Sequence, residues 1–182
     1  MIDDEVQCAT AILMTGGVVA LACERVWGLA CDAYSFASVK RILELKRRPI
    51  RNGLILVGGQ AAEFSAELAG LNEEQREKVV NSWPGPETWI METHRFPAWI
   101  TGGRGTVAVR VPGHEQAREM ARRFGGPLVS TSANRSGEEP KTRQDEVGKG
   151  FGSLVDYVLP GSTSASLGPS RIRVATTGEV LR

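Results

Sequence analysis

Cysteine and histidine are scarce in this 182-residue sequence, which limits the metal sites that it can form. The three cysteines are Cys8, Cys23 and Cys31, and the two histidines are His94 and His114. The number of cysteines is odd, and no pair has the C-x-x-C spacing of a structural zinc site. We therefore expect reduced thiols and no protein-bound structural metal.

The sequence also lacks long apolar runs and an excess of either charge. No apolar stretch approaches the roughly 20 residues that span a bilayer, and no charged N-terminal region leads into an apolar run with a small-residue cleavage site. Lys and Arg number 22 against 21 Asp and Glu, a formal net charge of +1. A charge so close to zero gives no global field that would favour a nucleic acid or a membrane as partner. We expect a cytoplasmic protein without membrane contact, in which any basic site is local.

Helical and strand patterns alternate along the chain, and 41% of its residues are hydrophobic, enough for a real core. Apolar spacing, capping residues and glycine stops predict helices over residues 3–15, 35–45, 60–69, 73–80 and 114–124. Apolar and β-branched runs predict strands over residues 18–21, 54–57, 106–111, 128–130, 154–158, 171–174 and 179–181. This order predicts the α/β class, a single domain over residues 1–182 built on one twisted mixed sheet with flanking helices. The Ser- and Gly-rich segment 161–168 is expected to form a mobile flap.

The densest cationic stretch lies at the end of the second predicted helix, around Pro49. Its members are Lys40, Arg41, Lys46, Arg47, Arg48 and Arg51. Lys46 and Arg48 fall on the loop side of the helix end, where an ammonium and a planar guanidinium can bind a polyphosphate together. The alternative is that these side chains only complement the helix dipole, a contribution of about 0.3 to 1 kcal/mol each. The stretch alone leaves both interpretations open.

Hydroxyl and amide side chains follow the apolar segment Pro127–Val129. The run Ser130–Asn134 contains three hydroxyls and one amide. Ligands of open α/β sheets gather beyond the carboxyl ends of strands, and such groups bond phosphate and ribose oxygens without adding charge. The run is equally consistent with a turn whose side chains bond their own backbone.

Arg110 interrupts the apolar run 107–111, where a charge is costly unless it is paired or lines a cleft. We interpret it as a candidate clamp for a carboxylate, with a solvent-facing strand position as the alternative. Two other segments are less informative. Trp83–Pro86 is predicted to be a rigid turn. The glycine-rich run Thr101–Gly105 lacks both phosphate-binding glycine patterns, and we interpret it as a hairpin loop.

Seven segments of the chain carry a resemblance to a known protein family. They are Glu24–Asp32 (ERVWGLACD), Leu43–Pro49 (LELKRRP), Gly53–Val57 (GLILV), Ser82–Pro86 (SWPGP), Val107–Pro112 (VAVRVP) with His114, Pro127–Asn134 (PLVSTSAN) and Pro169–Ile172 (PSRI). In this order and spacing they resemble the YrdC/Sua5/TsaC family of threonylcarbamoyl-AMP synthases. No segment is decisive alone, but the set covers essentially the whole chain. The length is similar to that of the short bacterial form, without the extra C-terminal domain of the longer Sua5 type.

The resemblance implies a YrdC-like fold with a large concave basic cavity, and it implies a reaction. L-Threonine, bicarbonate and ATP would give threonylcarbamoyl-AMP and pyrophosphate, with Mg²⁺ supplied together with the ATP substrate. A partner enzyme complex would then transfer the threonylcarbamoyl group to adenosine 37 of ANN-decoding tRNAs, the t6A modification. Such chemistry depends mainly on positioning and charge stabilisation.

The resemblance also assigns roles to individual residues. The positions that match the nucleotide- and phosphate-binding signature are Lys46, Arg48, Ser132 and Asn134. Of these, Lys46 and Arg48 are the expected catalytic pair.

The resemblance assigns a second set of residues to the threonine pocket. The positions that match it are Cys23, Arg110, Ser130 and Ser170. Arg110 is implied to hold the threonine carboxylate.

The main departure from the family pattern is the tetrapeptide Leu21–Glu24. It reads Leu-Ala-Cys-Glu where the family usually has Tyr-Pro-Thr-Glu. Cys23 replaces the threonine that contacts the amino-acid substrate, and a thiol forms weaker hydrogen bonds than a hydroxyl. Ala22 lacks the rigidity of proline. A second departure is Val174, where aspartate is common.

Two rival functions are open at this point. The first is a non-catalytic YrdC-like protein that binds double-stranded RNA or tRNA through backbone contacts, in keeping with the local basic stretch. The second is a different carbamoyl transfer on the same fold, as in the carbamoyltransferases of hydrogenase maturation. Those chains are much larger and carry zinc-finger-like and acylphosphatase-like regions, of which this sequence has no sign.

Overall fold

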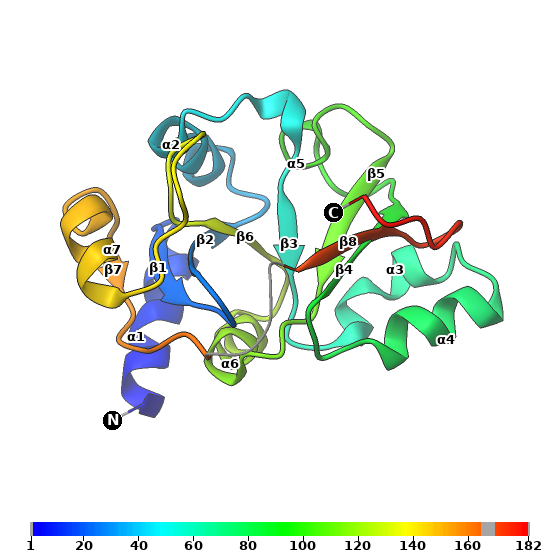
Figure 1. Cartoon of the computed structure of the whole chain (residues 1–182), viewed down its shortest axis with the longest axis horizontal. Coiled ribbons are helices and arrows are strands. Elements are labelled where there is room, and N and C mark those ends of the chain that lie inside the picture. Colours follow the sequence, from blue (N-terminus) through cyan, green and yellow to red (C-terminus); the bar gives the residue numbers. More distant parts are fainter. Residues whose placement is uncertain (1, 165–169, 182) are drawn as a thin grey trace.

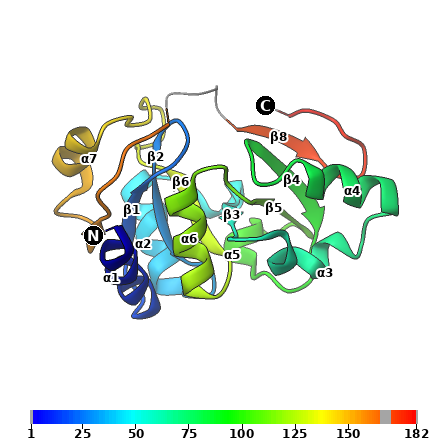
Figure 2. The same ribbon diagram turned by 90° about the horizontal axis from the view of Figure 1, so that it is seen from below.

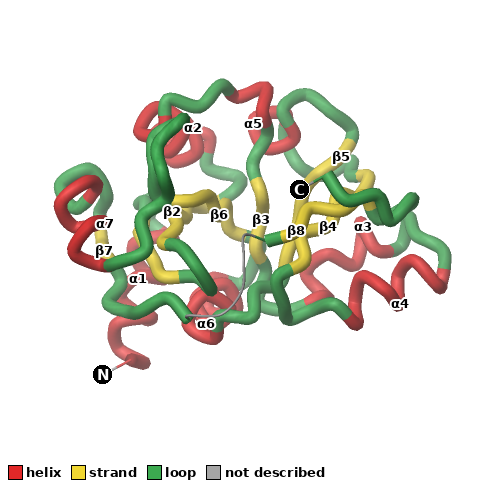
Figure 3. The backbone as a smooth tube through the Cα atoms, in the orientation of Figure 1, coloured by secondary structure: helices red, strands yellow, loops and turns green. Residues whose placement is uncertain are grey.

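The computed structural model describes residues 2–164 and 170–181. Its helices are α1 (Ile2–Met14), α2 (Phe36–Lys46), α3 (Ser65–Leu68), α4 (Glu73–Asn81), α5 (Ala98–Thr101), α6 (Glu115–Phe124) and α7 (Gln144–Phe151), with short 3-10 helices η1 (Ile50–Asn52) and η2 (Ala61–Phe64). Its strands are β1 (Val19–Ala22), β2 (Trp27–Asp32), β3 (Ile55–Val57), β4 (Glu87–Glu92), β5 (Thr106–Arg110), β6 (Leu128–Ser132), β7 (Tyr157–Val158) and β8 (Arg171–Val174). Figure 3 shows how helices and strands alternate in space.

Within the described part of the chain, these eight strands form one sheet in the order β7-β1-β2-β6-β3-β5-β4-β8 (Figure 1). The pairs β1 with β7, β3 with β5 and β4 with β8 are parallel. The pairs β1 with β2, β2 with β6, β6 with β3 and β5 with β4 are antiparallel. The predicted α/β class with a mixed sheet and flanking helices is therefore confirmed.

Helices cover both faces of the sheet, and strand β1 shows how its sequence requires this. All four residues of β1 are buried, although successive side chains of a strand point to opposite faces. Val19 and Leu21 belong to the apolar cluster with α1 and α6, whereas Ala20 and Ala22 belong to the cluster with α2. Figure 2 shows α1 and α6 on one side of the sheet, with α2 behind it. A strand buried on both faces carries a continuous apolar run, as β1 does.

Local sequence signals set the ends of several helices as predicted. The Ser35 hydroxyl accepts a hydrogen bond from the Ser38 N–H at 3.4 Å and caps α2. At α4, Asn72 and Gln75 form a reciprocal capping box, with bonds of 2.9 and 3.1 Å. Helix α6 ends at Gly125, whose φ of 81° is the left-handed conformation that glycine tolerates best.

Strands β2 and β4 and helix α7 are missing from the sequence-based prediction. Strand β2 contains a glycine and ends in aspartate, and β4 begins and ends with glutamate, so neither has a clear strand pattern. Helix α7 contains two glycines, which are poor helix formers. All three elements depend on contacts with distant parts of the chain, and a local sequence pattern does not indicate such contacts.

Several predicted elements are shorter than expected. The helix predicted over 60–69 is divided into η2 and α3, and Gln60 gives η2 no side-chain cap. The strand predicted over 154–158 is limited to β7, because the Leu154 carbonyl accepts from the Arg41 guanidinium at 2.7 Å instead of joining the ladder. The strand predicted over 179–181 is a single antiparallel bridge between Arg173 and Val180.

The predicted loops also differ in part from the structure. Trp83–Pro86 is a turn, as expected. The run Thr101–Gly105 is not a simple hairpin loop, because α5 ends at Thr101 and Gly102 caps it with a φ of 69°. Residues 165–168 of the predicted flap lie outside the described residues. Its first part is held in place, since the Ser164 hydroxyl donates to the Glu24 carbonyl at 3.1 Å. Among residues 2–164 and 170–181, no helix combines the length and apolar character needed to cross a membrane.

Adjacent residues of α1 provide a test of this packing. Leu13 is fully buried, whereas the Met14 side chain is 61% exposed. We expect Leu13→Ala to lower the free energy of unfolding by about 2–5 kcal/mol because it leaves a cavity in the core. Met14→Ala, the matched control, should change it by less than about 0.5 kcal/mol. Chemical denaturation followed by circular dichroism measures both, and equal effects of the two substitutions would contradict the placement of α1.

Candidate active site

A cavity of about 840 Å³ lies where strand ends and loops from both halves of the sheet meet. It is lined by the turn between β1 and β2, by parts of β3, β4, β5 and β6, and by β8. Among the described residues, its charged lining consists of Arg25, Arg48, Arg104, Arg110, Glu24 and Glu139. Cationic side chains therefore outnumber anionic ones, which suits an anionic ligand.

Most of the predicted site residues meet in this cavity. Those that line it are Cys23, Arg48, Arg110, Ser130, Ser132 and Ser170. They come from distant parts of the sequence, so the fold brings the separate motifs together. Lys46 and Asn134 are not among the described residues of the lining, and they lie behind the end of β6.

Lys46 is buried, although it lies at the end of helix α2 next to the loop around Pro49. Only 4% of the residue is exposed. Its Nζ donates to the Ser132 carbonyl, to the Asn134 carbonyl at 2.9 Å and to Asn134 Oδ1 at 3.1 Å. Burial, with a smaller effect of the Arg48 charge, lowers the pKa of the ammonium from 10.5 to about 8. The three N–H groups of Lys46 thus bind the end of strand β6 to the end of helix α2.

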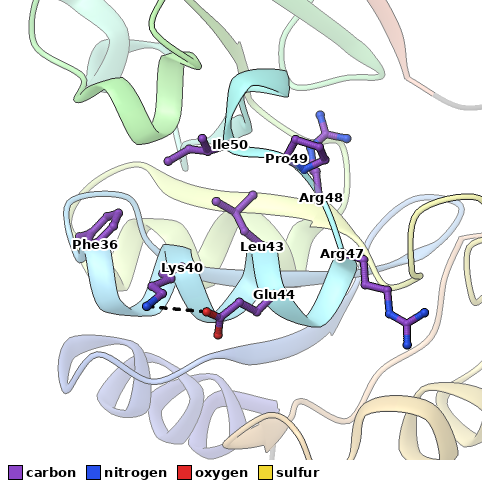
Figure 4. Close-up of a pocket in the computed structure, with 8 residues that line it drawn as sticks. All are labelled: Phe36, Lys40, Leu43, Glu44, Arg47, Arg48, Pro49 and Ile50. Carbon is purple, nitrogen blue, oxygen red and sulfur yellow. Dashed lines mark ion pairs between the residues drawn. The ribbon is translucent and has the colours of Figure 1, made fainter.

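Arg48 is the member of the basic stretch that reaches the cavity. Arg47 turns the chain after α2 with a left-handed φ of 51°. Figure 4 shows Arg47 and Arg48 pointing away from each other beside a second, open groove of about 460 Å³. Lys40 lies in that groove, 3.8 Å from Glu44. The Arg48 guanidinium donates to the Gly53 carbonyl at 3.0 Å, which fixes its direction.

The hydroxyl-rich run Ser130–Asn134 forms the end of β6 and the turn after it, and the structure agrees with both interpretations of its sequence. Ser130 and Ser132 line the cavity, as a ligand site requires. Asn134 is occupied within its own turn, since its Oδ1 accepts from the Ser132 hydroxyl at 2.6 Å and its Nδ2 donates to the Glu138 carbonyl at 2.7 Å. The serines therefore face the cavity while the asparagine organises the loop.

Arg110 is paired with a residue to which the sequence analysis assigns no role. Its Nε donates to the Gly85 carbonyl at 2.9 Å, so the Trp83–Pro86 turn orients the guanidinium. Its Nη2 forms an ion pair with Glu24, whose Oε1 also accepts from the Gly113 N–H. Glu24 stands in a quoted motif, but its partner lies 86 residues away, and no local signal indicates the pair. Arg110 lines a cleft and is paired, which excludes the solvent-facing alternative.

Cys23 and Ser130 face a space left by a glycine. A Cβ atom on Gly28 would lie 3.5 Å from the Ser130 hydroxyl and 3.7 Å from Cys23 Sγ. Burial, followed by the charge of Glu24, raises the pKa of the Cys23 thiol from 9.0 to about 11. Arg110 and a hydrogen bond with Ser130 lower it by less. The thiol therefore stays protonated and acts as a neutral polar group at neutral pH.

The Sua5/YciO/YrdC family model, described as "Telomere recombination", matches residues 11–182 of the chain. This chain belongs to the Sua5/YrdC family. It is 43% identical to a threonylcarbamoyl-AMP synthase of Hahella chejuensis over 178 residues, 97% of both chains. It is 44% identical to a threonylcarbamoyl-AMP synthase of Halorhodospira halophila over 178 residues, 97% of this chain and 93% of the relative.

A solved structure of this family supports the same assignment. Sua5 of P. abyssi complexed with L-threonine superposes with a TM-score of 0.86 and 30% identity, over 93% of this chain and 50% of that one. This Sua5/YrdC chain thus spans about half the length of the P. abyssi protein, in agreement with the predicted short bacterial form. The curated bacterial relatives are matched over nearly their whole length.

The raised pKa of Cys23 predicts how the thiol reacts. With a pKa of about 11 in place of 9.0, its thiolate fraction at pH 7.5 is roughly 100-fold lower than that of an ordinary thiol. Alkylation by iodoacetamide should therefore be slow and should rise about tenfold per pH unit towards pH 11. Mass spectrometry of modified peptides follows Cys23 and the exposed Cys8 in one sample. Modification of Cys23 as fast as Cys8 at pH 7.5 would contradict the geometry.

The position of Lys46 predicts a structural cost for its removal. Lys46→Met removes the donor of the half-buried Ser132 and Asn134 carbonyls, so we expect a loss of about 1–3 kcal/mol in the free energy of unfolding. Lys40→Met is the matched control in the same helix, because the Lys40 side chain is 61% exposed and its pairing with Glu44 contributes less than about 0.5 kcal/mol. Urea denaturation compares the two variants. A Lys46→Met protein as stable as wild type would show that the ammonium does not hold the loop.

Proposed function

We propose that this chain is an L-threonylcarbamoyladenylate synthase, a nucleotidyltransferase that forms threonylcarbamoyl-AMP and pyrophosphate from L-threonine, bicarbonate and ATP. The observation that carries the proposal is the convergence in one cavity of a phosphate-binding group, Arg48 with Ser132, and a carboxylate-binding group, Arg110. Two relatives with this name are 43% and 44% identical to this chain over 97% of its length, which supports the same activity.

The cavity divides between the two substrates in this proposal. Arg48 and Ser132 bind the nucleotide and its phosphates, and Lys46 and Asn134 hold the end of β6, where Ser132 lies. Arg110 binds the threonine carboxylate, and Cys23 and Ser130 contact the rest of the amino acid. Ser170, at the start of the C-terminal strand, completes the threonine side.

The proposed chemistry consists of two nucleophilic reactions between the substrates, and it needs no covalent intermediate with the protein. The threonine nitrogen attacks the carbon of bicarbonate and gives a carbamate with loss of one water. A carbamate oxygen then attacks the α-phosphorus of ATP with release of pyrophosphate. Positioning of the reactants and stabilisation of the phosphate charge by Arg48 supply most of the rate. Mg²⁺ enters with ATP in this proposal. In residues 2–164 and 170–181, no cluster of three or more His, Cys, Asp or Glu side chains is placed to hold a metal.

The product suggests the setting in which the protein acts. A carbamoyl adenylate is an activated acyl donor, so a downstream enzyme complex must accept the threonylcarbamoyl group, and we propose that it modifies adenosine 37 of ANN-decoding tRNAs. In this proposal the protein acts in the cytoplasm. Direct binding of tRNA or double-stranded RNA belongs to the rival, non-catalytic interpretation.

A pyrophosphate-release assay with single omissions separates these functions. A synthase should release pyrophosphate from ATP only when threonine and bicarbonate are both present. Release that ignores threonine would indicate a plain ATPase. No release at all, together with RNA binding that weakens steeply with salt, would support the rival.

The two ends of the cavity should give different kinetic defects when altered. Arg110→Ala should raise the KM for threonine by roughly 10- to 150-fold, the loss of a charged hydrogen bond, with little change in the KM for ATP. Arg48→Ala should chiefly impair the use of ATP. Arg76→Ala removes an exposed arginine of α4 and serves as the control, with kinetics expected to match wild type. Equal effects of Arg110→Ala on both substrates would refute the division of the cavity.

A further inference from the structure

The carboxylate of Glu24 has one satisfied oxygen and one that has no partner. Oε1 accepts from Arg110 Nη2 and from the Gly113 N–H. Oε2 is inaccessible to solvent and makes no hydrogen bond within the described residues. The Glu24 side chain is 19% exposed and belongs to the cavity lining. Glu24 therefore lines the cavity while one of its carboxylate oxygens lacks a hydrogen-bond donor.

Such an oxygen needs an explanation, because a buried acceptor without a donor costs about 1–3 kcal/mol and more when it is charged. Glu63 is a useful comparison. Its Oε1 accepts from the Gly59 N–H at 2.9 Å and its Oε2 is buried without a partner, but Glu63 does not line the cavity. Among the described lining residues, Glu24 is the only carboxylate in this state. A ligand that brings an N–H donor to the cavity would satisfy it.

The ion pair of Arg110 and Glu24 has the charge pattern that complements a free α-amino acid. An amino acid carries its carboxylate and its ammonium on the same carbon, so it needs a cation and an anion side by side. Arg110 uses Nε and Nη2 within the protein, and Nη1 makes no hydrogen bond within the described residues. Nη1 is thus available to bind the substrate carboxylate. Oε2 belongs to the carboxylate that pairs with Arg110, and it can accept a hydrogen bond from the substrate ammonium.

We propose that Glu24 binds the ammonium group of threonine through Oε2 and acts as the base that removes its proton, an inference that rests on the proposed function. An N–H bond of the ammonium breaks, an O–H bond forms on Glu24, and the nitrogen keeps its electron pair. The neutral amine then attacks the bicarbonate carbon, and the new carbamate forms with loss of one water. Glu24 returns its proton to solvent before the next turnover.

Glu24→Gln tests the base directly, because the amide can still accept from Arg110 and Gly113 but cannot take a proton. We expect kcat to fall by about 10²- to 10⁴-fold. The residual rate should rise about tenfold per pH unit between pH 7 and 9, as the free amine becomes more abundant, whereas the wild-type rate should not. Glu63→Gln is the matched control, and its rate and pH profile should equal those of wild type. A Glu24→Gln enzyme with wild-type kcat and pH profile would overturn the proposal.

Binding measurements distinguish two roles of Glu24: contact with the substrate ammonium, and orientation of Arg110 alone. The probes are L-threonine and 2,3-dihydroxybutyrate, which has a hydroxyl in place of the ammonium, titrated calorimetrically into both proteins. Glu24→Gln should weaken binding of threonine but not of the hydroxy acid. Equal weakening of both would mean that Glu24 only positions Arg110, and the proposal would fail. If the wild-type protein released no pyrophosphate, the proposed synthase function would be wrong. The binding data would still show whether Glu24 contacts the ammonium, because only that contact predicts a selective loss of threonine binding in Glu24→Gln.

Discussion

The ion pair between Arg110 and Glu24 links the two halves of the sheet, and the shape of the cavity depends on it. Glu24 belongs to the turn after β1, and Arg110 ends β5, with β6 and β3 between their parts of the sheet. Two loops take part as well, because the Gly85 carbonyl accepts from Arg110 and the Gly113 N–H donates to Glu24. Because four segments of the chain contact this ion pair, its two side chains are oriented before a ligand binds. Such preorganisation is what a site needs if it works by electrostatics and positioning.

Lys46 makes a corresponding connection at the part of the cavity that we propose binds the nucleotide. It joins the last turn of α2 to the carbonyls at the end of β6, from which Ser132 faces the cavity. Its lowered pKa reflects the cost of holding a cation in a mostly buried place. Arg48, two residues further on, lines the cavity. The basic stretch therefore combines a buried structural cation with one that lines the cavity, where the sequence alone suggests two equivalent ones.

Much of the fold follows from local pattern, and the exceptions have a common cause. Helices α1, α2, α4 and α6 have clear apolar spacing with caps or glycine stops, and all four are predicted close to their observed bounds. The sequences of strands β2 and β4 have no clear strand pattern, because these segments are placed in the sheet by pairing with distant strands. The site shows the same limit. The resemblance names Arg110 and Cys23, but no local pattern indicates that Glu24 pairs with an arginine 86 residues away. That the chain forms a single domain over residues 1–182 stays a prediction.

The central claim is that one cavity joins threonine, bicarbonate and ATP, and the most direct measurement is the identity of the product. The purified protein would be incubated with L-threonine, ¹³C-bicarbonate and ATP, and the nucleotides would be separated and weighed by mass spectrometry. The account predicts threonylcarbamoyl-AMP that carries the label in its carbamoyl carbon, together with an equal amount of pyrophosphate. Hydrolysis of ATP without a labelled adenylate, or an adenylate without the ¹³C atom, would contradict it.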